Sequence, residues 1–418
     1  MNTLALVTAL AAQATAPSGS TTSVVDTPTG NGSAQSGTIS YVDLEASAGY
    51  STNPVQQVVG STGSAYGRFS VTGVHSRVSA LSTTTITAFG QESIYSHRNG
   101  SQLSADIRAN HSARVSSRFS IWGSLEGSID KGGQLDTRII GNPFVPTVPG
   151  LQQPPIVLLP GQQSLFVRGR QERILADAGG ALSLSSRDSI SFRSGFEYLD
   201  SKSGTFDTRY TTIPVSVGYS RTLSARTSIG AELQYEHTDF KGPGKFWDLS
   251  PRLTLNQMLS PHLNLSVSIG PSFSTTNNGV TTTHSTGVAG SANLCSQTGL
   301  RTQFCGTLSV SQQTATAIGA SKSISAGFNY SRRLDANQTL RFSVDGSRYS
   351  TPTLLVTGTS FSHATYVRAA ADYSRRIGGG RWFVGTNLGA RKLTQPGPDP
   401  KMDFSGSVFI RYRLGDIR

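Results

Sequence analysis

Gln102-Leu-Ser-Ala-Asp-Ile-Arg-Ala-Asn-His-Ser-Ala-Arg-Val-Ser-Ser-Arg-Phe-Ser-Ile-Trp-Gly-Ser-Leu-Glu-Gly-Ser-Ile129 shows the repeat on which this chain is built. Apolar and polar residues alternate in its first half, a short polar break follows, and the alternation returns in its second half. Because successive side chains of a strand point to opposite faces, the period of two predicts two strands, and the tight break predicts a hairpin. Each run is about 10 residues long, which is the length that a tilted strand needs to cross a bilayer.

A soluble β-sandwich also contains hairpins of this kind, so the decisive feature is how often the pattern recurs. Alternating runs continue from Ile39 to Leu414, and they add up to about 18 strands, an even number as a single-chain outer-membrane barrel requires. We therefore expect an all-β protein, a closed antiparallel up-and-down transmembrane β-barrel over residues 38–415. Its connections alternate in length, which predicts short periplasmic turns and longer outer loops.

The composition agrees with a barrel better than with the alternatives. The chain has 418 residues, 45 of them Gly, and only 36% hydrophobic residues. No run approaches the 18 or so apolar residues of a transmembrane helix, which excludes that class. A barrel explains the low hydropathy, because half of each strand faces water. The net charge is +12, but Lys and Arg are spread along the chain without clustering, so we expect no nucleic-acid partner.

Three segments fall outside the alternating pattern. Residues 1–16 have an apolar core and small residues suited to cleavage near Ala14 or Ala16, which predicts a signal peptide, although no Lys or Arg precedes the core. A frayed tail is the alternative. Residues 17–37 are rich in Ser, Thr, Gly and Pro and predict a flexible polar leader. Residues 130–164 contain six prolines, which forbid a ladder strand. We expect a long Pro-rich outer loop that folds over or into the pore mouth.

The parity that faces the inside of the barrel carries charges of both signs. Two interpretations stay open: these residues pair across neighbouring strands and fill the wall, or they set the solute selectivity of a pore. A barrel of this size usually leaves an aqueous channel unless it is plugged. The predicted lumen-lining residues are Arg108, Arg118, Glu126, Arg193, Glu197, Glu232, Arg252, Arg341, Asp345, Arg368, Asp372, Arg391 and Arg411.

The two cysteines, Cys295 and Cys305, have the same inward parity and flank one short connection. Opposed residues of a hairpin have Cα separations that suit a disulfide, and the periplasm is oxidising. We therefore predict a Cys295–Cys305 disulfide. A metal site is not expected, because no cluster of histidines or acidic residues accompanies the pair.

Catalytic signals are weak. His237 with Asp239 near the outer rim is what a barrel protease would need, but no second acidic pair accompanies it. His111 lies near the opposite rim from the one a barrel lipase would use. No Gly-rich phosphate loop or nucleophile elbow occurs. We expect no enzymatic activity, no cofactor and no metal, and keep a barrel hydrolase as the last alternative.

The region from Ile39 to Leu414 resembles Gram-negative outer-membrane β-barrels. Its last strand, Phe404-Ser-Gly-Ser-Val-Phe-Ile-Arg-Tyr-Arg-Leu414, looks like the C-terminal signal read by the barrel assembly machinery, although the chain continues as Gly-Asp-Ile-Arg418 beyond it. The polar leader, the pair Asn53-Pro54 after the first strand and the Gly/Ser/Arg-rich strands resemble the β-barrel porins associated with exopolysaccharide gene clusters.

These resemblances imply a location in the bacterial outer membrane. They imply as partners the outer-membrane lipid and lipopolysaccharide, the barrel assembly machinery and polysaccharide export components. The expected function is a porin-like channel for polar solutes, including oligosaccharide or polysaccharide export or uptake. The alternative is a structural or adhesive barrel with a closed lumen, because the charge pattern alone does not distinguish an open lumen from a closed one.

Overall fold

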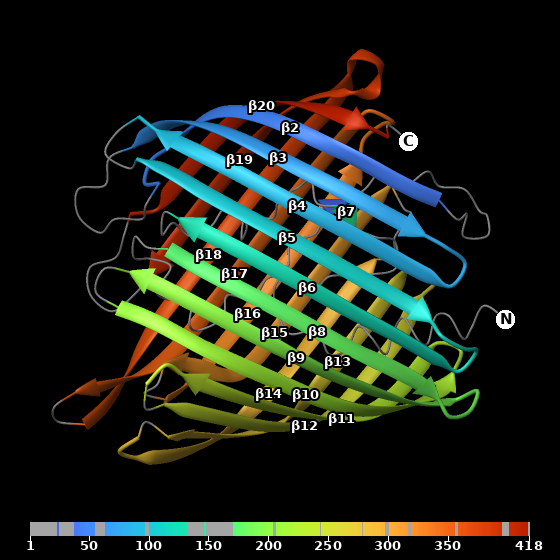
Figure 1. The fold of residues 1–418 in the computed structure, drawn as a ribbon, viewed down its shortest axis with the longest axis vertical. Coiled ribbons are helices and arrows are strands. Elements are labelled where there is room, and N and C mark those ends of the chain that lie inside the picture. Colours follow the sequence, from blue (N-terminus) through green and yellow to red (C-terminus); the bar gives the residue numbers. More distant parts are fainter. Residues whose placement is uncertain are drawn as a thin grey trace.

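Eighteen antiparallel strands form a closed ring in the computed structural model (Figure 1). The structure describes residues 23–24, 37–54, 63–96, 100–131, 146–147, 170–203, 206–242, 244–277, 279–296, 301–316, 319–355, 358–394 and 401–416. The barrel strands are β2 (Gly37–Ser51), β3 (Ser64–Val78), β4 (Ser82–Tyr95), β5 (Ser101–Arg114), β6 (Phe119–Lys131), β8 (Arg170–Ser183), β9 (Asp188–Ser203), β10 (Phe206–Ser224), β11 (Thr227–Phe240), β12 (Lys245–Ser260), β13 (Leu263–Asn277), β14 (Thr282–Ser296), β15 (Thr302–Thr316), β16 (Gly319–Arg333), β17 (Gln338–Leu355), β18 (Gly358–Ile377), β19 (Trp382–Thr394) and β20 (Asp403–Gly415). The predicted fold class is confirmed.

The last strand closes the ring. β20 pairs with β19 on one side and with β2 on the other, and every other barrel strand pairs with its neighbours along the chain. β2 begins and β20 ends on the same side of the barrel, where Tyr41 is paired with Gly415 (Figure 1). The turns on that side are short, whereas the longest connections, between β2 and β3, β6 and β8, and β19 and β20, lie on the opposite side. Short turns mark the periplasmic side of such barrels.

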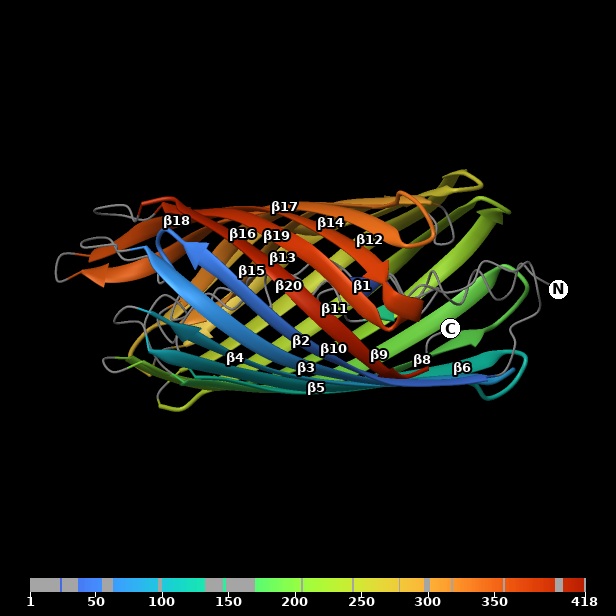
Figure 2. The same ribbon diagram turned by 90° about the horizontal axis from the view of Figure 1, so that it is seen from above.

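The ring is flattened. The barrel is broad in Figure 1 and shallow when it is seen from above in Figure 2, with the strands inclined to its axis in both views. The part of the chain that the structure describes contains no helix with the length and hydropathy of a transmembrane span.

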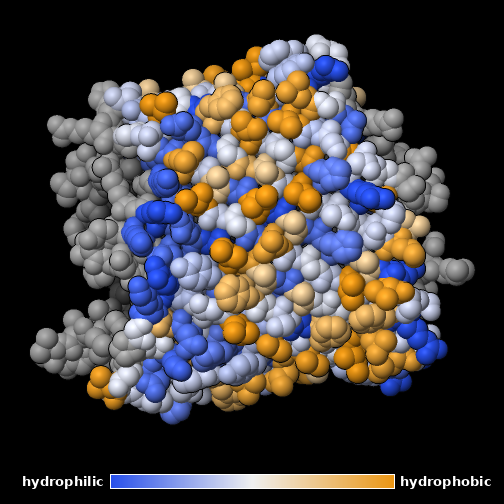
Figure 3. Space-filling view, in the orientation of Figure 1, coloured by the Kyte–Doolittle hydropathy of each residue, from blue (hydrophilic) through white to orange (hydrophobic). Residues whose placement is uncertain are grey.

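The two faces of each strand differ in the way that the alternation predicts. On β10, Val217 is 52% exposed, whereas its inward neighbour Ser216 is 8% exposed. Leu253, on the outward face of β12, is 70% exposed. Apolar side chains are spread across the visible wall between paler, weakly polar ones, and strongly hydrophilic side chains gather mainly towards its left edge (Figure 3). Such a surface is unfavourable in water and favourable against lipid, so the wall is that of a membrane-spanning barrel located in the outer membrane.

Two short strands lie apart from the wall. β1 (Ser23–Val24) pairs in parallel with β7 (Pro146–Thr147), and Figures 1 and 2 both draw this pair within the ring of barrel strands. The predicted signal peptide (1–16) lies outside the described residues, as does most of the predicted leader (17–37) and of the predicted Pro-rich loop (130–164).

Arg118 requires a correction. The alternation suggested that it lines the lumen, but it lies exposed in the turn between β5 and β6, before β6 begins. Its backbone N–H donates to the hydroxyl of Ser116 at 3.2 Å. The alternation of polar and apolar residues continues through this short turn, so the alternation alone does not show at which residue the strand begins.

Candidate functional site

The lumen face is the candidate site, and its first feature is a group of ion pairs on β5, β6, β8 and β9. Arg108 Nη2 donates to Glu126 Oε2 at 2.6 Å, and these residues are directly opposed in neighbouring strands. Arg193 donates through two nitrogens to the two carboxylate oxygens of Asp177, at 2.7 and 2.8 Å. Such forked pairs fix both side chains in direction as well as position.

Arg173 continues this group. Its Nε donates to Glu197 Oε1 at 3.0 Å, and both side chains are largely buried. The guanidinium of Arg193 also lies 5.4 Å from the ring centre of Trp122, which adds a cation–π contact. Glu126, Arg193 and Glu197 are among the residues predicted to line the lumen, and each of them is a member of an ion pair.

A second group lies where the barrel closes, near the periplasmic side. Arg413 donates twice to Asp43, at 2.8 Å each, and Arg411 approaches the same carboxylate at 3.8 Å. The two guanidinium groups cover aromatic rings: Arg413 lies 3.9 Å from the centre of Tyr41, and Arg411 lies 4.4 Å from the centre of Phe383. Charge and stacking together tie β20 to β2 and β19.

A third group lies at the opposite end of the same seam. Asp403 accepts hydrogen bonds from Arg391 Nε at 2.8 Å, Ser51 Oγ at 2.7 Å and the backbone N–H of Asn53 at 2.8 Å. Arg391 also donates to the carbonyl oxygen of Pro54 at 2.6 Å. One buried carboxylate therefore joins β19, β20 and the segment that follows β2.

The remaining predicted charges lie on β11, β12, β17 and β18. Arg368 lies 3.7 Å from Asp345, and Arg341 is directly opposite Asp372 in the ladder between β17 and β18. Glu232 is directly opposite Arg252 in the ladder between β11 and β12. These pairings again bring opposite charges together.

Two carboxylates break this rule. Glu236 lies opposite Asp248 in the ladder between β11 and β12. Asp248 accepts hydrogen bonds from Ser250 Oγ and Ser272 Oγ, at 2.5 Å each. Hydroxyl donors stabilise a carboxylate without neutralising its charge, so Asp248 is held by hydroxyl groups and has no basic residue directly opposite it on β11.

The arrangement favours the pairing interpretation for most of the predicted residues. Short ion pairs cancel much of the field that isolated charges would project into the lumen. The list of predicted lumen-lining residues left out four partners, Asp43, Arg173, Asp177 and Asp403. The alternation that identified Arg193 and Glu197 applies to them as well, so extending it to every strand would have found them.

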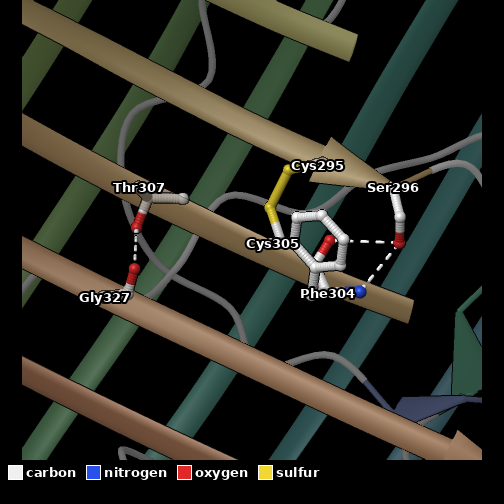
Figure 4. The surroundings of a disulfide bond; sticks show 6 residues. All are labelled: Cys295, Ser296, Phe304, Cys305, Thr307 and Gly327. Carbon is white, nitrogen blue, oxygen red and sulfur yellow. Dashed lines mark hydrogen bonds between the residues drawn. A yellow bond between two sulfur atoms is a disulfide. The ribbon is translucent and has the colours of Figure 1, made fainter. Parts of the chain in front are cut away.

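Cys295 and Cys305 are directly opposed in β14 and β15 and form a disulfide, with a Cα–Cα distance of 4.0 Å (Figure 4). Ser296 Oγ donates to the carbonyl oxygen of Phe304 at 3.2 Å and accepts from its N–H at 2.7 Å. These contacts fasten the hairpin on the side of the short turns.

The histidines with catalytic patterns lie on the outer face of the wall. His237 Nε2 lies 3.0 Å from Asp239, which also lies 3.7 Å from Lys245. His111 Nδ1 lies 2.8 Å from the hydroxyl of Thr84. Within the described ranges, no group of three His, Cys, Asp or Glu side chains could hold a metal ion.

Neither a family model nor a curated protein sequence matches this chain. Among solved structures, it is similar to the FrpB iron transporter from Neisseria meningitidis. For the F5-1 variant in its apoprotein form the identity is 9% and the TM-score 0.46, over 90% of this chain and 81% of the other. For the F3-3 variant the identity is 9% and the TM-score 0.42, and this chain covers 62% of that chain with 84% of its own length.

A second similar structure is OccK2 (OpdF) from Pseudomonas aeruginosa in complex with glucuronate. The identity is 10% and the TM-score 0.43, over 90% of this chain and 98% of the other. The closed wall of 18 strands and its apolar exterior identify the chain as an outer-membrane β-barrel.

Proposed function

We propose that this barrel is an outer-membrane channel for polar solutes. The observation that carries the proposal is the contrast between the faces of the wall, because charged and hydroxyl side chains point inward from a closed ring. An inward polar face is what a water-filled channel requires, since each polar group there can exchange hydrogen bonds with water or solute.

We propose further that the solute is a carbohydrate. Most lumen charges face an opposite charge in the wall, as Arg108 faces Glu126 and Arg193 faces Asp177. Paired charges project a weak net field, which suits hydrated neutral solutes better than a strongly selective ion filter. The resemblance to porins associated with exopolysaccharide clusters supports polysaccharide export components as partners.

Recording from single barrels in planar lipid bilayers tests the channel. We expect discrete conductance steps from protein whose folding has been checked by heat-modifiable migration on gels. Folded protein that gives no conductance above the background of the lipid would contradict the proposal. Swelling of liposomes in neutral sugars of increasing size then tests the solute class, and swelling only in salts would exclude carbohydrate.

A structural or adhesive barrel with a closed lumen is the second candidate. The observation that favours it is burial, because Arg368 is 3% exposed and Arg411 is 5% exposed although both face inward. Guanidinium groups in an open water-filled channel would be more exposed. The same bilayer recording separates the two candidates, since a closed barrel that folds and inserts carries no current.

A further inference from the structure

An apolar groove crosses the outer face of the barrel over β9 to β13. Its volume is about 570 Å³. Outward residues form two rows along the direction of the ladder hydrogen bonds. One row is Ile190, Tyr219, Ala231, Leu253 and Ile269, and the other is Val217, Leu233, Pro251 and Pro271. The groove faces the hydrocarbon region of the membrane, so water is not its natural occupant.

Two prolines that line the groove lie where the ladder between β12 and β13 is interrupted. The β12–β13 ladder pairs Leu249 with Phe273 and Leu253 with Ile269, but the three residue pairs between them are not joined. Pro251 and Pro271 occupy the middle of this gap, and neither has an N–H to donate. A Cβ on Gly270 would lie 1.8 Å from the carbonyl oxygen of Pro251, so only glycine allows this approach.

The groove ends near basic side chains on the periplasmic side. Arg221 lies on the same outward face, two residues beyond Tyr219 along β10, and it is opposite Asp188 in the ladder. Arg187, in the turn before β9, is also exposed. Tyr219 donates through its hydroxyl to Asp188 at 2.6 Å, and Ser185 Oγ donates to the same carboxylate at 2.6 Å.

These contacts leave a net positive charge at the end of the groove. Two guanidinium groups accompany one carboxylate, which lies 3.9 Å from Arg221 and is engaged by two hydroxyl donors. Each guanidinium has five N–H donors in a fork that matches phosphate geometry. The apolar groove is complementary to the acyl chain of a lipid. The exposed arginines at its end, at the level of the lipid head groups, are complementary to an anionic head group.

We propose that this groove binds one acyl chain of an anionic glycerophospholipid from the periplasmic leaflet, with its phosphate held by Arg187 and Arg221. We assign the head-group site to the periplasmic leaflet because Arg187 lies in the short turn between β8 and β9 and Arg221 lies just before the short turn that follows β10. Short turns mark the periplasmic side of such barrels. Bound lipid fills the depression over the broken ladder, where an unfilled one would leave the Pro251 and Pro271 rings without packing partners. The proposal does not depend on whether the lumen conducts.

Native mass spectrometry tests whether the groove binds lipid. The barrels are reconstituted with phosphatidylglycerol, and detergent then removes the loosely bound lipid before the measurement. We expect one retained phosphatidylglycerol per wild-type barrel and at least a fivefold loss of the lipid-bound species in Ala231→Phe, whose ring fills the groove. Ala109→Phe is the matched control, because Ala109 faces outward on β5 away from the groove. Equal retention of the lipid by Ala231→Phe and wild type overturns the proposal. A spectrum in which the barrel is a dimer without bound lipid also overturns it, because a second copy would then occupy the groove.

The head-group contact has its own test, which remains informative if Ala231→Phe fails to fold. The variant Arg187→Gln/Arg221→Gln should lose the preference for phosphatidylglycerol over phosphatidylcholine that wild type shows in a mixture of equal amounts. Arg375→Gln, on the outward face of β18, is the control. An unchanged preference in the double variant overturns the role of the two arginines.

Discussion

Replacing Asp403 by alanine should loosen the closing seam of the barrel. The carboxylate is 2% exposed and accepts hydrogen bonds from Arg391, Ser51 and Asn53, all at 2.8 Å or less. Removing it leaves a buried guanidinium without its carboxylate, a change that typically costs about 3–5 kcal/mol. We therefore expect Asp403→Ala to lower the free energy of unfolding by about 3–5 kcal/mol.

Urea unfolding of the barrel in lipid vesicles, followed by the fluorescence of its 3 tryptophans, measures this loss. Lys245→Gln is the matched control, because its pair with Asp239 is exposed on both sides and such pairs contribute about 0–1 kcal/mol. Adding Arg391→Met to Asp403→Ala should recover part of the loss, since no buried charge then remains. A loss in Asp403→Ala no larger than that in Lys245→Gln would refute the role of this carboxylate in closure.

Three further changes probe other parts of the wall. Leu253→Arg places a charge on the lipid face and should cost about 2–4 kcal/mol in vesicle unfolding, whereas the inward Thr254→Arg should cost less; equal costs would contradict the assignment of faces. Replacing Cys295 and Cys305 together by serine opens the loop that the disulfide closes and should cost about 2–3 kcal/mol; an unchanged urea midpoint under non-reducing conditions would argue against the bond. If the barrel conducts, Arg252→Gln should shift the reversal potential in a salt gradient towards cation selectivity, because the facing glutamate loses its counter-charge; a shift towards anions would contradict that pairing.

The alternation predicted the strands well for a physical reason. In a barrel wall one face meets lipid and the other meets polar groups, so every strand must keep the period of two. The residues of β5 and β6 show this clearly, because Ile107 and Leu125 are exposed and Arg108 and Glu126 are not. The same signal misplaced Arg118, since a turn of a few polar residues does not interrupt the parity.

The candidate site was predictable only in part. Parity indicated that Arg391 faces inward, but nothing in the local sequence shows that its carboxylate partner is Asp403 rather than another acidic residue. The partner depends on which strand lies alongside and in which register, and turn geometry and ring closure together decide both.

The amino-acid sequence alone therefore determined which segments cross the membrane and which of their side chains face lipid, because both follow from a local period. Only the tertiary structure decided which charges meet. Asp43 and Arg413 are 370 positions apart and form one ion pair because β20 returns to β2. Pro251 and Pro271 face each other and break the ladder because β12 and β13 pair in one register. Contacts between strands depend on closure of the whole ring, and closure is not a local property of any segment.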